Sequence, residues 1–156
     1  MKFYIATRLE NHLQHNTVRD FLIVAGHSIT YDWTSHGPVW KAGTKVIREV
    51  ACAELNGVVE ADVVVVLLPG GRGTHAELGM AIALGKPVLL CGGPEMYGAV
   101  PETCAFYHHP LVLHLPLWVM DELEFFVERW PQTAPAPTES IQPIIGREEL
   151  PRMPKA

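Results

Sequence analysis

The sequence predicts a small doubly wound α/β fold, a parallel sheet with helices on both faces. Short apolar runs rich in β-branched residues alternate with longer stretches whose apolar residues recur at helical spacing. Residues 63–68 are continuously apolar, which is typical of a strand buried on both faces. Strands that alternate with helices imply parallel strands joined by helical crossovers. We therefore expect about five parallel strands in one Rossmann or flavodoxin-like sheet.

Each element is predicted from its own stretch of sequence. The first helix carries apolar residues at helical spacing until Gly26, a residue type that commonly ends helices. In the second helix, Ile47, Val50, Leu55 and Val58 share one side. The predicted strands are residues 3–6, 28–33, 63–68, 87–91 and 111–115, and the predicted helices are residues 11–25, 44–60, 73–85 and 118–129.

The chain is predicted to hold one α/β domain, residues 1–130, followed by a proline-rich C-terminal tail, residues 131–156. A chain of 156 residues, 48% of them hydrophobic, is long enough for one domain with a substantial core. The tail has six prolines, balanced charges and little periodicity. We expect an extended arm, either loose or laid across a neighbouring subunit.

Composition and charge exclude several classes of function. A formal net charge of −5, with 12 Lys and Arg and no basic run, argues against nucleic acid as a partner. The three cysteines are widely spaced, which argues against a disulfide framework and a zinc cluster and is typical of a reducing compartment. The eight histidines form no metal set, because His108 and His109 are expected to point to opposite sides of a strand. We expect neither a metal nor another cofactor.

Neither the start of the chain nor its longest uncharged stretch is suited to a membrane. A charge comes too early in the first eight residues, MKFYIATR, for the apolar core of a signal peptide. Residues 103–120 contain no Asp, Glu, Lys or Arg, but three His and two Pro interrupt them. The sequence therefore predicts a soluble, cytoplasmic protein without a membrane partner.

Three predicted strands end in residues suited to ligand binding. These ends are Thr7-Arg8 after the first strand, Asp32-Trp33 after the second, and residues 69–74 (PGGRGT) after the third. Parallel strands bring their carboxyl ends to one edge of a sheet, and ligands of open α/β sheets bind beyond that edge. We therefore expect the functional site there.

The glycine-rich turn at residues 70–74 is the strongest of these features. Glycines let a ligand approach the backbone closely, and the following helix start offers free N–H groups to a phosphate or another anion. Glu77, one turn into that helix, is expected to face the same crevice. The alternative is a capping box, in which Glu77 only accepts a hydrogen bond from the Thr74 N–H.

The region around this turn resembles the nucleoside 2-deoxyribosyltransferase family, which includes related nucleotide N-hydrolases. The matching residues are Ala61-Asp62-Val63-Val64-Val65 and Gly73-Thr74-x-x-Glu77-Leu78-Gly79-x-Ala81-x-x-x-Gly85-Lys86-Pro87-Val88, within a resemblance that covers about residues 2–91. The resemblance implies an enzyme whose nucleophile, Glu77, attacks the anomeric carbon and forms a glycosyl-enzyme ester. It also implies an acidic residue eight positions before Asp62, which is Glu54 here, where Asp is usual in the family.

Three residues are expected to carry the chemistry. Glu77 is expected to be kept ionised by backbone N–H groups and the helix dipole, and Tyr4 to donate a hydrogen bond to it. Glu54 is expected to orient the sugar or to pass a proton to the departing base. Glu54 lies on the flank of the apolar helix face, where burial of a carboxylate costs free energy and therefore suggests a function. Alternatively, Glu54 is a carboxylate at the rim of the helix face that reaches water. The alternative for Tyr4 is an aromatic residue of the core.

The substrate contacts are predicted from the same strand ends. Arg8 or Arg72 is a candidate for binding a 5′-phosphate. Trp33, beside Tyr31, forms either an aromatic wall for a base or part of the core, and Asp32 is a candidate acceptor for base or ribose groups. At the Gly71 position, the resemblance implies Asp in the transferases and Ser in the hydrolases, so a base contact is missing. The predicted substrate-binding residues are Thr7, Arg8, Asp32, Trp33, Gly70, Gly71, Arg72, Gly73 and Thr74.

Three functions stay open at this point. Transfer of deoxyribose between bases is the leading hypothesis, nucleotide N-hydrolysis is the second, and a nucleotide-binding sensor without turnover is the third. The turn also resembles the cytokinin-activating phosphoribohydrolases, but residues 1–42 contain only Gly26 and Gly37 and so lack that family's Gly-rich phosphate loop. The partner is therefore expected to be a small nucleoside or nucleotide.

The family resemblance also implies a homo-oligomer, a dimer or larger, whose sites borrow residues from a neighbouring subunit. Met96-Tyr97, after the fourth predicted strand, and the proline-rich tail are the candidates for that exchange. This expectation follows from analogy with the family alone.

Overall fold

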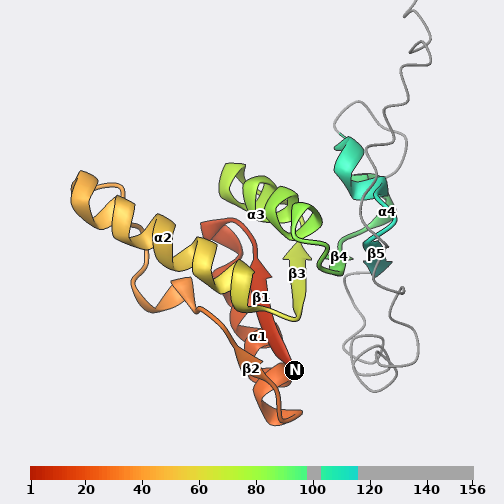
Figure 1. Cartoon of the computed structure of the whole chain (residues 1–156), viewed down its shortest axis with the longest axis horizontal. Coiled ribbons are helices and arrows are strands. Elements are labelled where there is room, and N and C mark those ends of the chain that lie inside the picture. The colour runs from red at the N-terminus through yellow and green to blue at the C-terminus, as the bar shows by residue number, and fades with distance from the viewer. Residues whose placement is uncertain (98–102, 116–156) are drawn as a thin grey trace, which may run out of the picture.

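The computed structural model describes residues 1–97 and 103–115, which form a five-stranded, all-parallel sheet (Figure 1). The strands are β1 (Lys2–Ala6), β2 (Ser28–Ile29), β3 (Val63–Leu67), β4 (Val88–Cys91) and β5 (Val112–Leu115), in the order β2-β1-β3-β4-β5. This sheet confirms the predicted doubly wound α/β class. The predicted helix 118–129, the tail 131–156 and the boundary between domain and tail lie outside the described residues.

Helices cover both faces of the sheet. The main helices are α1 (His12–Val24), α2 (Thr44–Glu60) and α3 (Arg72–Ala83), and α4 (Pro94–Tyr97) is a single turn. Side chains alternate along β1, so Phe3 and Ile5 pack with Leu22 of α1, whereas Tyr4 packs on the opposite face with Val58 of α2 and Leu78 of α3. The sheet therefore separates two apolar clusters, and Tyr4 belongs to the one beneath α2 and α3.

The central strand β3 aligns the ends of its neighbours. All five of its residues are buried, and it pairs in register with β1 through Ala6 and Val66 and with β4 through Leu67 and Cys91. The hydroxyl of Thr7 donates a hydrogen bond to the carbonyl oxygen of Leu67 at 2.9 Å, which ties the ends of β1 and β3 together. The segments that follow these strands consequently lie side by side.

Gly57 allows α2 to lie close to β1. A Cβ atom at this position would stand 2.8 Å from Cδ2 and Cε2 of the Tyr4 ring and 2.8 Å from Cβ of Tyr31. No larger residue fits this contact without displacing the ring. Thr30 also donates a hydrogen bond from its hydroxyl to the Gly57 carbonyl oxygen at 2.8 Å. The absence of a side chain at Gly57 therefore helps to fix where the Tyr4 ring lies.

Two local predictions were wrong. The second strand ends at Ile29 rather than residue 33, because the Asp32 side chain accepts a hydrogen bond from the Thr34 N–H and starts the 3₁₀ turn Trp33–Ser35. His108 lies in another 3₁₀ turn, Ala105–His108, and His109 caps it, so neither residue is in a strand. Among the described helices, none is long and apolar enough to span a membrane.

Candidate active site

An open cavity of about 340 Å³ lies beyond the carboxyl ends of β1 and β3. Such a volume is within the usual range for small-molecule sites. Residues predicted from the sequence form much of its lining, namely Thr7, Arg8, Trp33, Glu54, Gly71, Arg72, Gly73, Thr74 and Glu77. Three other predicted residues, Tyr4, Asp32 and Gly70, do not line it. The predicted sheet edge thus holds a cavity in the structure.

Tyr4, Thr74 and Glu77 form what we call the floor of the cavity. Tyr4 is fully buried, and its hydroxyl donates a 2.6 Å hydrogen bond to Oε1 of Glu77. Glu77 is 6% exposed, and it is one of the residues that line the cavity. The sequence-based expectation of a hydrogen bond between these side chains is confirmed, and Tyr4 lies beneath Glu77 rather than in the cavity.

Glu77 does not cap helix α3. The helix begins at Arg72 with Gly71 as its N-cap residue, three residues earlier than a Thr74 cap requires. The hydroxyl of Thr74 accepts a hydrogen bond from the Gly71 N–H at 3.0 Å. The free N–H groups of a helix are in its first turn, and Glu77 lies beyond that turn. Its hydrogen bond to Tyr4 explains its orientation better than a capping box does.

The expectation that backbone N–H groups keep Glu77 ionised was wrong. Burial raises the pKa of Glu77 to about 7, and the negative charge of Glu54 acts in the same direction. The hydrogen bond from Tyr4 opposes both effects and favours the carboxylate. The same burial, followed by the charge of Glu77, raises the pKa of Tyr4, so the phenol keeps its proton as a donor. Near neutral pH, Glu77 therefore exists in both protonation states.

Glu54 supplies a second carboxyl group to the same cavity. It lies on α2 and is half-buried, and burial raises its pKa, while the charge of His36 pulls the pKa down. Carboxyl groups with raised pKa values that face one cavity from two helices are typical of acid–base sites. The half-buried position of Glu54 is compatible with both interpretations from the sequence, a catalytic carboxyl group and a rim carboxylate that reaches water.

The glycine-rich turn packs closely against its neighbours. A Cβ atom at Gly71 would stand 3.3 Å from Cβ of Arg8, and one at Gly70 would stand 3.0 Å from Cγ2 of Thr74. Nδ1 of His75 donates to the Gly71 carbonyl oxygen at 2.7 Å, so Nε2 is left to accept from the Tyr107 hydroxyl, also at 2.7 Å. His75 thus links the turn to Tyr107.

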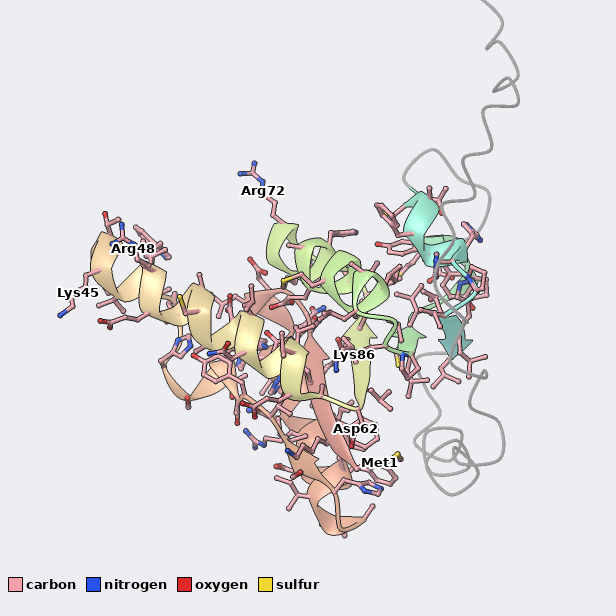
Figure 2. The ribbon with its side chains drawn as sticks, in the orientation of Figure 1. Met1, Lys45, Arg48, Asp62, Arg72 and Lys86 are labelled. Carbon is pink, nitrogen blue, oxygen red and sulfur yellow. The ribbon has the colours of Figure 1, made fainter. Side chains whose placement is uncertain are left out.

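The two arginines of the predicted site are exposed. Nε of Arg8 lies 3.9 Å from Oε2 of Glu10. Arg72 extends away from the body of the protein at the start of α3 (Figure 2). Both line the cavity. They are therefore available to an anionic part of a ligand near the helix start.

Sequence reasoning missed one side of the cavity. Residues 33–40, which we call the wall, follow β2, and they include His36, Gly37, Pro38, Val39 and Trp40 in addition to Trp33. Leu9 and Val50 complete the lining. Trp40 is 69% exposed, whereas Trp33 is 6% exposed and donates from Nε1 to the Ile5 carbonyl oxygen at 3.2 Å. A tryptophan in a Gly- and Pro-containing loop after a strand was the signal that could have revealed the wall.

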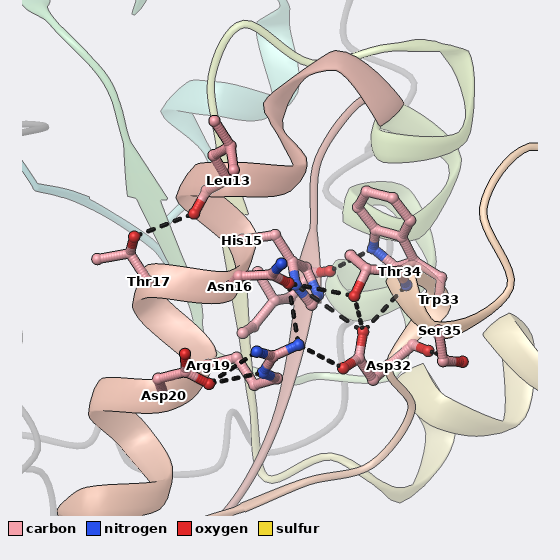
Figure 3. A network of polar contacts seen from close by, with 11 residues as sticks. Leu13, His15, Asn16, Thr17, Arg19, Asp20, Asp32, Trp33, Thr34 and Ser35 are labelled. Atoms are coloured by element: carbon pink, nitrogen blue, oxygen red, sulfur yellow. Dashed lines mark hydrogen bonds and ion pairs between the residues drawn. The ribbon is translucent and has the colours of Figure 1, made fainter.

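Asp32 lies outside the cavity and binds protein groups instead of a ligand. Its Oδ2 accepts a 2.9 Å hydrogen bond from Nη1 of Arg19 on α1, and its Oδ1 accepts from Thr34 (Figure 3). Within residues 1–97 and 103–115, no cluster of three or more His, Cys, Asp or Glu side chains suits a metal ion. Met96 and Tyr97 are also absent from the cavity lining.

Comparison with known proteins identifies the family. The sequence profile of the nucleoside 2-deoxyribosyltransferase family matches residues 3–123. The CMP N-glycosidase BcmB of Clostridium botulinum has a similar structure, with a TM-score of 0.56 and 18% identity over 83% of this chain and 99% of that chain, which shows a shared fold. The 2-deoxyribosyltransferase of Bacillus psychrosaccharolyticus is similar with a TM-score of 0.50 and 25% identity over 58% of this chain and 72% of that chain.

No protein of curated function matches the chain significantly. The family match nevertheless spans most of the sequence and includes all the residues that line the cavity. The fold, the cavity and the profile agree. The chain therefore belongs to the nucleoside 2-deoxyribosyltransferase family.

Proposed function

We propose that this protein cleaves the N-glycosidic bond of a nucleoside or its 5′-monophosphate through a glycosyl ester on Glu77, with transfer to a second base as the main reaction. The observation that carries the proposal is the buried pair of Tyr4 and Glu77 at the floor of the cavity. Both structural neighbours are named for activities of this kind, an N-glycosidase and a deoxyribosyltransferase. Membership of the family supports the same reaction class.

The first step forms the ester. Tyr4 holds Oε1 of Glu77, so Oε2 is left to attack the anomeric carbon C1′. The bond between C1′ and the base nitrogen breaks, and its electron pair leaves with the base. Glu54, whose raised pKa favours the protonated acid, gives its proton to the departing base. The carboxylate of Glu77 stabilises the positive charge that develops on the sugar.

The second step returns the enzyme to its starting state. A nitrogen of a second base attacks C1′, Glu77 leaves as the carboxylate, and the proton of the incoming base goes to Glu54. Water can take the same place, with Glu54 again accepting the proton, and the product is then the free sugar or sugar phosphate. The acceptor that reaches C1′ first decides between transfer and hydrolysis.

Hydrolysis of a nucleoside 5′-monophosphate is the second candidate, and two observations favour it. Arg8, Arg72 and the start of α3 offer positive charge and N–H donors to the cavity. Gly71 presents no side chain where the family resemblance places the base-binding Asp of the transferases. A phosphate anchored by the arginines and the helix start would compensate for the missing base contact.

Chromatography of reaction mixtures tests the proposal. Purified protein is incubated with 2′-deoxynucleosides, ribonucleosides and their 5′-monophosphates, each with and without a second free base. A new nucleoside that forms only with the added base demonstrates transfer, and free base released without it demonstrates hydrolysis. If a nucleotide binds in calorimetry but every substrate stays intact, the sensor hypothesis replaces the proposal.

A trapping experiment tests the covalent step separately. A 2′-fluorinated nucleoside slows breakdown of a glycosyl ester, so intact mass spectrometry is expected to show the protein plus one sugar. Peptide mapping is expected to place the added mass on Glu77, and the Glu77→Gln variant to show none. Adducts on another residue would contradict Glu77 as the nucleophile.

A further inference from the structure

The wall of the cavity has little regular structure of its own. Between the end of β2 at Ile29 and the start of α2 at Thr44, the structure contains only the 3₁₀ turn Trp33–Ser35. Backbone ladders therefore do not fix the position of this stretch. Side-chain contacts must do so, and they are concentrated at its beginning.

Arg19 and Asp32 join this beginning to helix α1 (Figure 3). Nη1 of Arg19 lies 2.9 Å from Oδ2 of Asp32 and 2.9 Å from Oδ1 of Asn16. Oδ1 of Asp32 accepts from the Thr34 N–H at 3.0 Å and lies 2.5 Å from the Thr34 hydroxyl. Both charged side chains are partly buried, with 23% and 29% of their surface exposed. A charge-assisted bond of this kind is stronger than a neutral one.

The same network reaches the cavity through Trp33. His15 of α1 is fully buried, and its ring meets the ring of Trp33 edge-on, with centroids 4.9 Å apart. Nδ1 of His15 lies 3.3 Å from Oδ1 of Asn16 and 4.0 Å from Oδ1 of Asp32. Burial lowers the pKa of His15, which therefore packs as a neutral ring. One end of the network is thus a charge pair and the other end is a tryptophan that lines the cavity.

We propose that Arg19 and Asp32 are positioning residues, whose ion pair holds residues 33–40 where they can receive the base of the substrate. The proposal rests on the proposed function for the identity of the ligand. Neither residue touches the cavity, and Tyr4 and Glu77 are carried by β1 and α3. Loss of the pair should therefore cost substrate binding, because the wall must be ordered at each binding event, and should leave the chemical step intact.

The test combines amide hydrogen exchange with kinetics on the full chain. Arg19→Gln and Asp32→Asn each remove the ion pair, and Asn at position 32 can still accept from the Thr34 N–H. Arg19→Lys keeps the charge. Asp20→Asn is the matched control, because Asp20 also pairs with Arg19, at 2.8 Å, but is 65% exposed and lies on the helix surface away from the wall.

In Arg19→Gln and Asp32→Asn, we expect exchange in a peptide covering residues 33–40 to become about tenfold faster, with exchange in α3 unchanged. KM for the substrate found above should rise about tenfold, with kcat within twofold of the original value. Arg19→Lys should recover most of both effects, and Asp20→Asn should show neither. A purely structural role would instead lower kcat, or accelerate exchange throughout the sheet.

The two readouts separate failure of this inference from failure of the proposed function. Unchanged exchange in residues 33–40 of Arg19→Gln overturns the inference, whatever the protein catalyses. A rise in exchange without any turnover by the unmodified protein overturns the proposed function, and it still supports the part of the inference in which the ion pair positions residues 33–40. Faster exchange with KM unchanged shows that the wall does not contact the substrate, and it also overturns the inference.

Discussion

The floor and the wall of the cavity are built in different ways. The floor residues Tyr4, Thr74 and Glu77 lie on the inner strand β1 and on helix α3, where regular backbone hydrogen bonds and burial in the core fix them. The wall, residues 33–40, has one short 3₁₀ turn and is attached through side-chain hydrogen bonds near Asp32. The difference indicates that the floor, on regular elements, holds the reacting groups, and that the wall, which is a loop, binds the substrate.

This difference between the floor and the wall predicts different kinetic effects of substitutions in the two regions. Changes in the floor should lower kcat, because they remove groups that act in the transition state, whereas changes in the wall should raise KM.

Replacement of the nucleophile should have the largest effect. In Glu77→Gln, the amide cannot form a glycosyl ester, so we expect kcat to fall at least about a thousandfold. Binding of a substrate analogue should stay within about threefold, because Gln has the same shape and Tyr4 can still donate to its oxygen. Steady-state kinetics and calorimetry measure the two quantities.

Glu49→Gln is the matched control for this substitution, because Glu49 is an exposed residue on α2. It should leave both kcat and affinity unchanged. Retained turnover in Glu77→Gln would mean that the floor does not carry the reacting group, and the separation between floor and wall would fail.

The pH dependence should have the next largest effect. Attack on C1′ requires ionised Glu77 and protonated Glu54, so kcat/KM should follow a bell-shaped pH profile. It should rise as Glu77 loses its proton around pH 7 and fall as Glu54 loses the proton that it gives to the base. In Tyr4→Phe the carboxylate of Glu77 loses its donor, and the midpoint of the rise should move to higher pH. A profile with no group titrating between pH 6 and 8 would contradict the role of the floor.

The same raised pKa has a consequence for stability that activity does not report. A carboxyl group whose folded pKa exceeds its unfolded value stabilises the fold while it is protonated. That stability should be complete below about pH 4.5 and should be lost as the pH rises through about 7, with a total of about 3 kcal/mol. Thermal unfolding should therefore show Glu77→Gln to be more stable than the unmodified protein at pH 8 and about equally stable at pH 4.5.

Filling the space at Gly57 should disturb the floor without touching the cavity. The Cβ of Gly57→Ala would stand 2.8 Å from the Tyr4 ring, so we expect a loss of about 1–3 kcal/mol in unfolding free energy and a fall in kcat. Gly79→Ala on α3 is the control, because its Cβ would meet nothing within 4 Å. It should be neutral or slightly stabilising. Denaturant unfolding measures both, and equal effects at the two glycines would contradict the close contact.

Replacement of Trp40 in the wall should have the smallest effect, and it should change KM rather than kcat. Trp40 is 69% exposed and lines the cavity, so Trp40→Ala should raise KM about threefold to tenfold through lost stacking on the base and leave kcat within twofold. Phe106→Ala, at an aromatic residue that is 54% exposed and outside the cavity, should change neither constant. Initial rates over a range of substrate concentrations decide the outcome, and a fall in kcat would assign Trp40 to the chemistry.

The part of the site on regular elements could be predicted from the sequence. Helix α2 was predicted with the bounds it has, and β3 within one residue, because their apolar periodicity is strong. The hydrogen bond between Tyr4 and Glu77 was predicted once the family resemblance had marked Glu77, with a core aromatic as the alternative for Tyr4. In the structure Tyr4 is both fully buried and bonded to Glu77. Even so, the spacing Thr74-x-x-Glu77 fitted a capping box equally well, and only the start of α3 at Arg72 decided between the two.

The rest of the site could not be predicted, since it depends on tertiary contacts without a sequence period. Asp32 reads as a ligand-binding residue at a strand end, but its position is set by Arg19, thirteen residues earlier on a helix. The raised pKa of Glu77 follows from burial, which no local pattern encodes. Trp40 and its neighbours lie in a loop whose path is determined by these contacts.

The pairing of β1 with β3 has a consequence for the order of events in folding. Tyr4 and Glu77 are 73 residues apart in the chain, and Tyr4 pairs in register with Val64, so their hydrogen bond requires a long-range parallel pairing. Such pairings close large loops and form slowly. A partly folded chain that has its helices but not this pairing has no floor. We therefore expect activity to return late during refolding, and a nascent chain to remain inert until the residues beyond Glu77 have been synthesised.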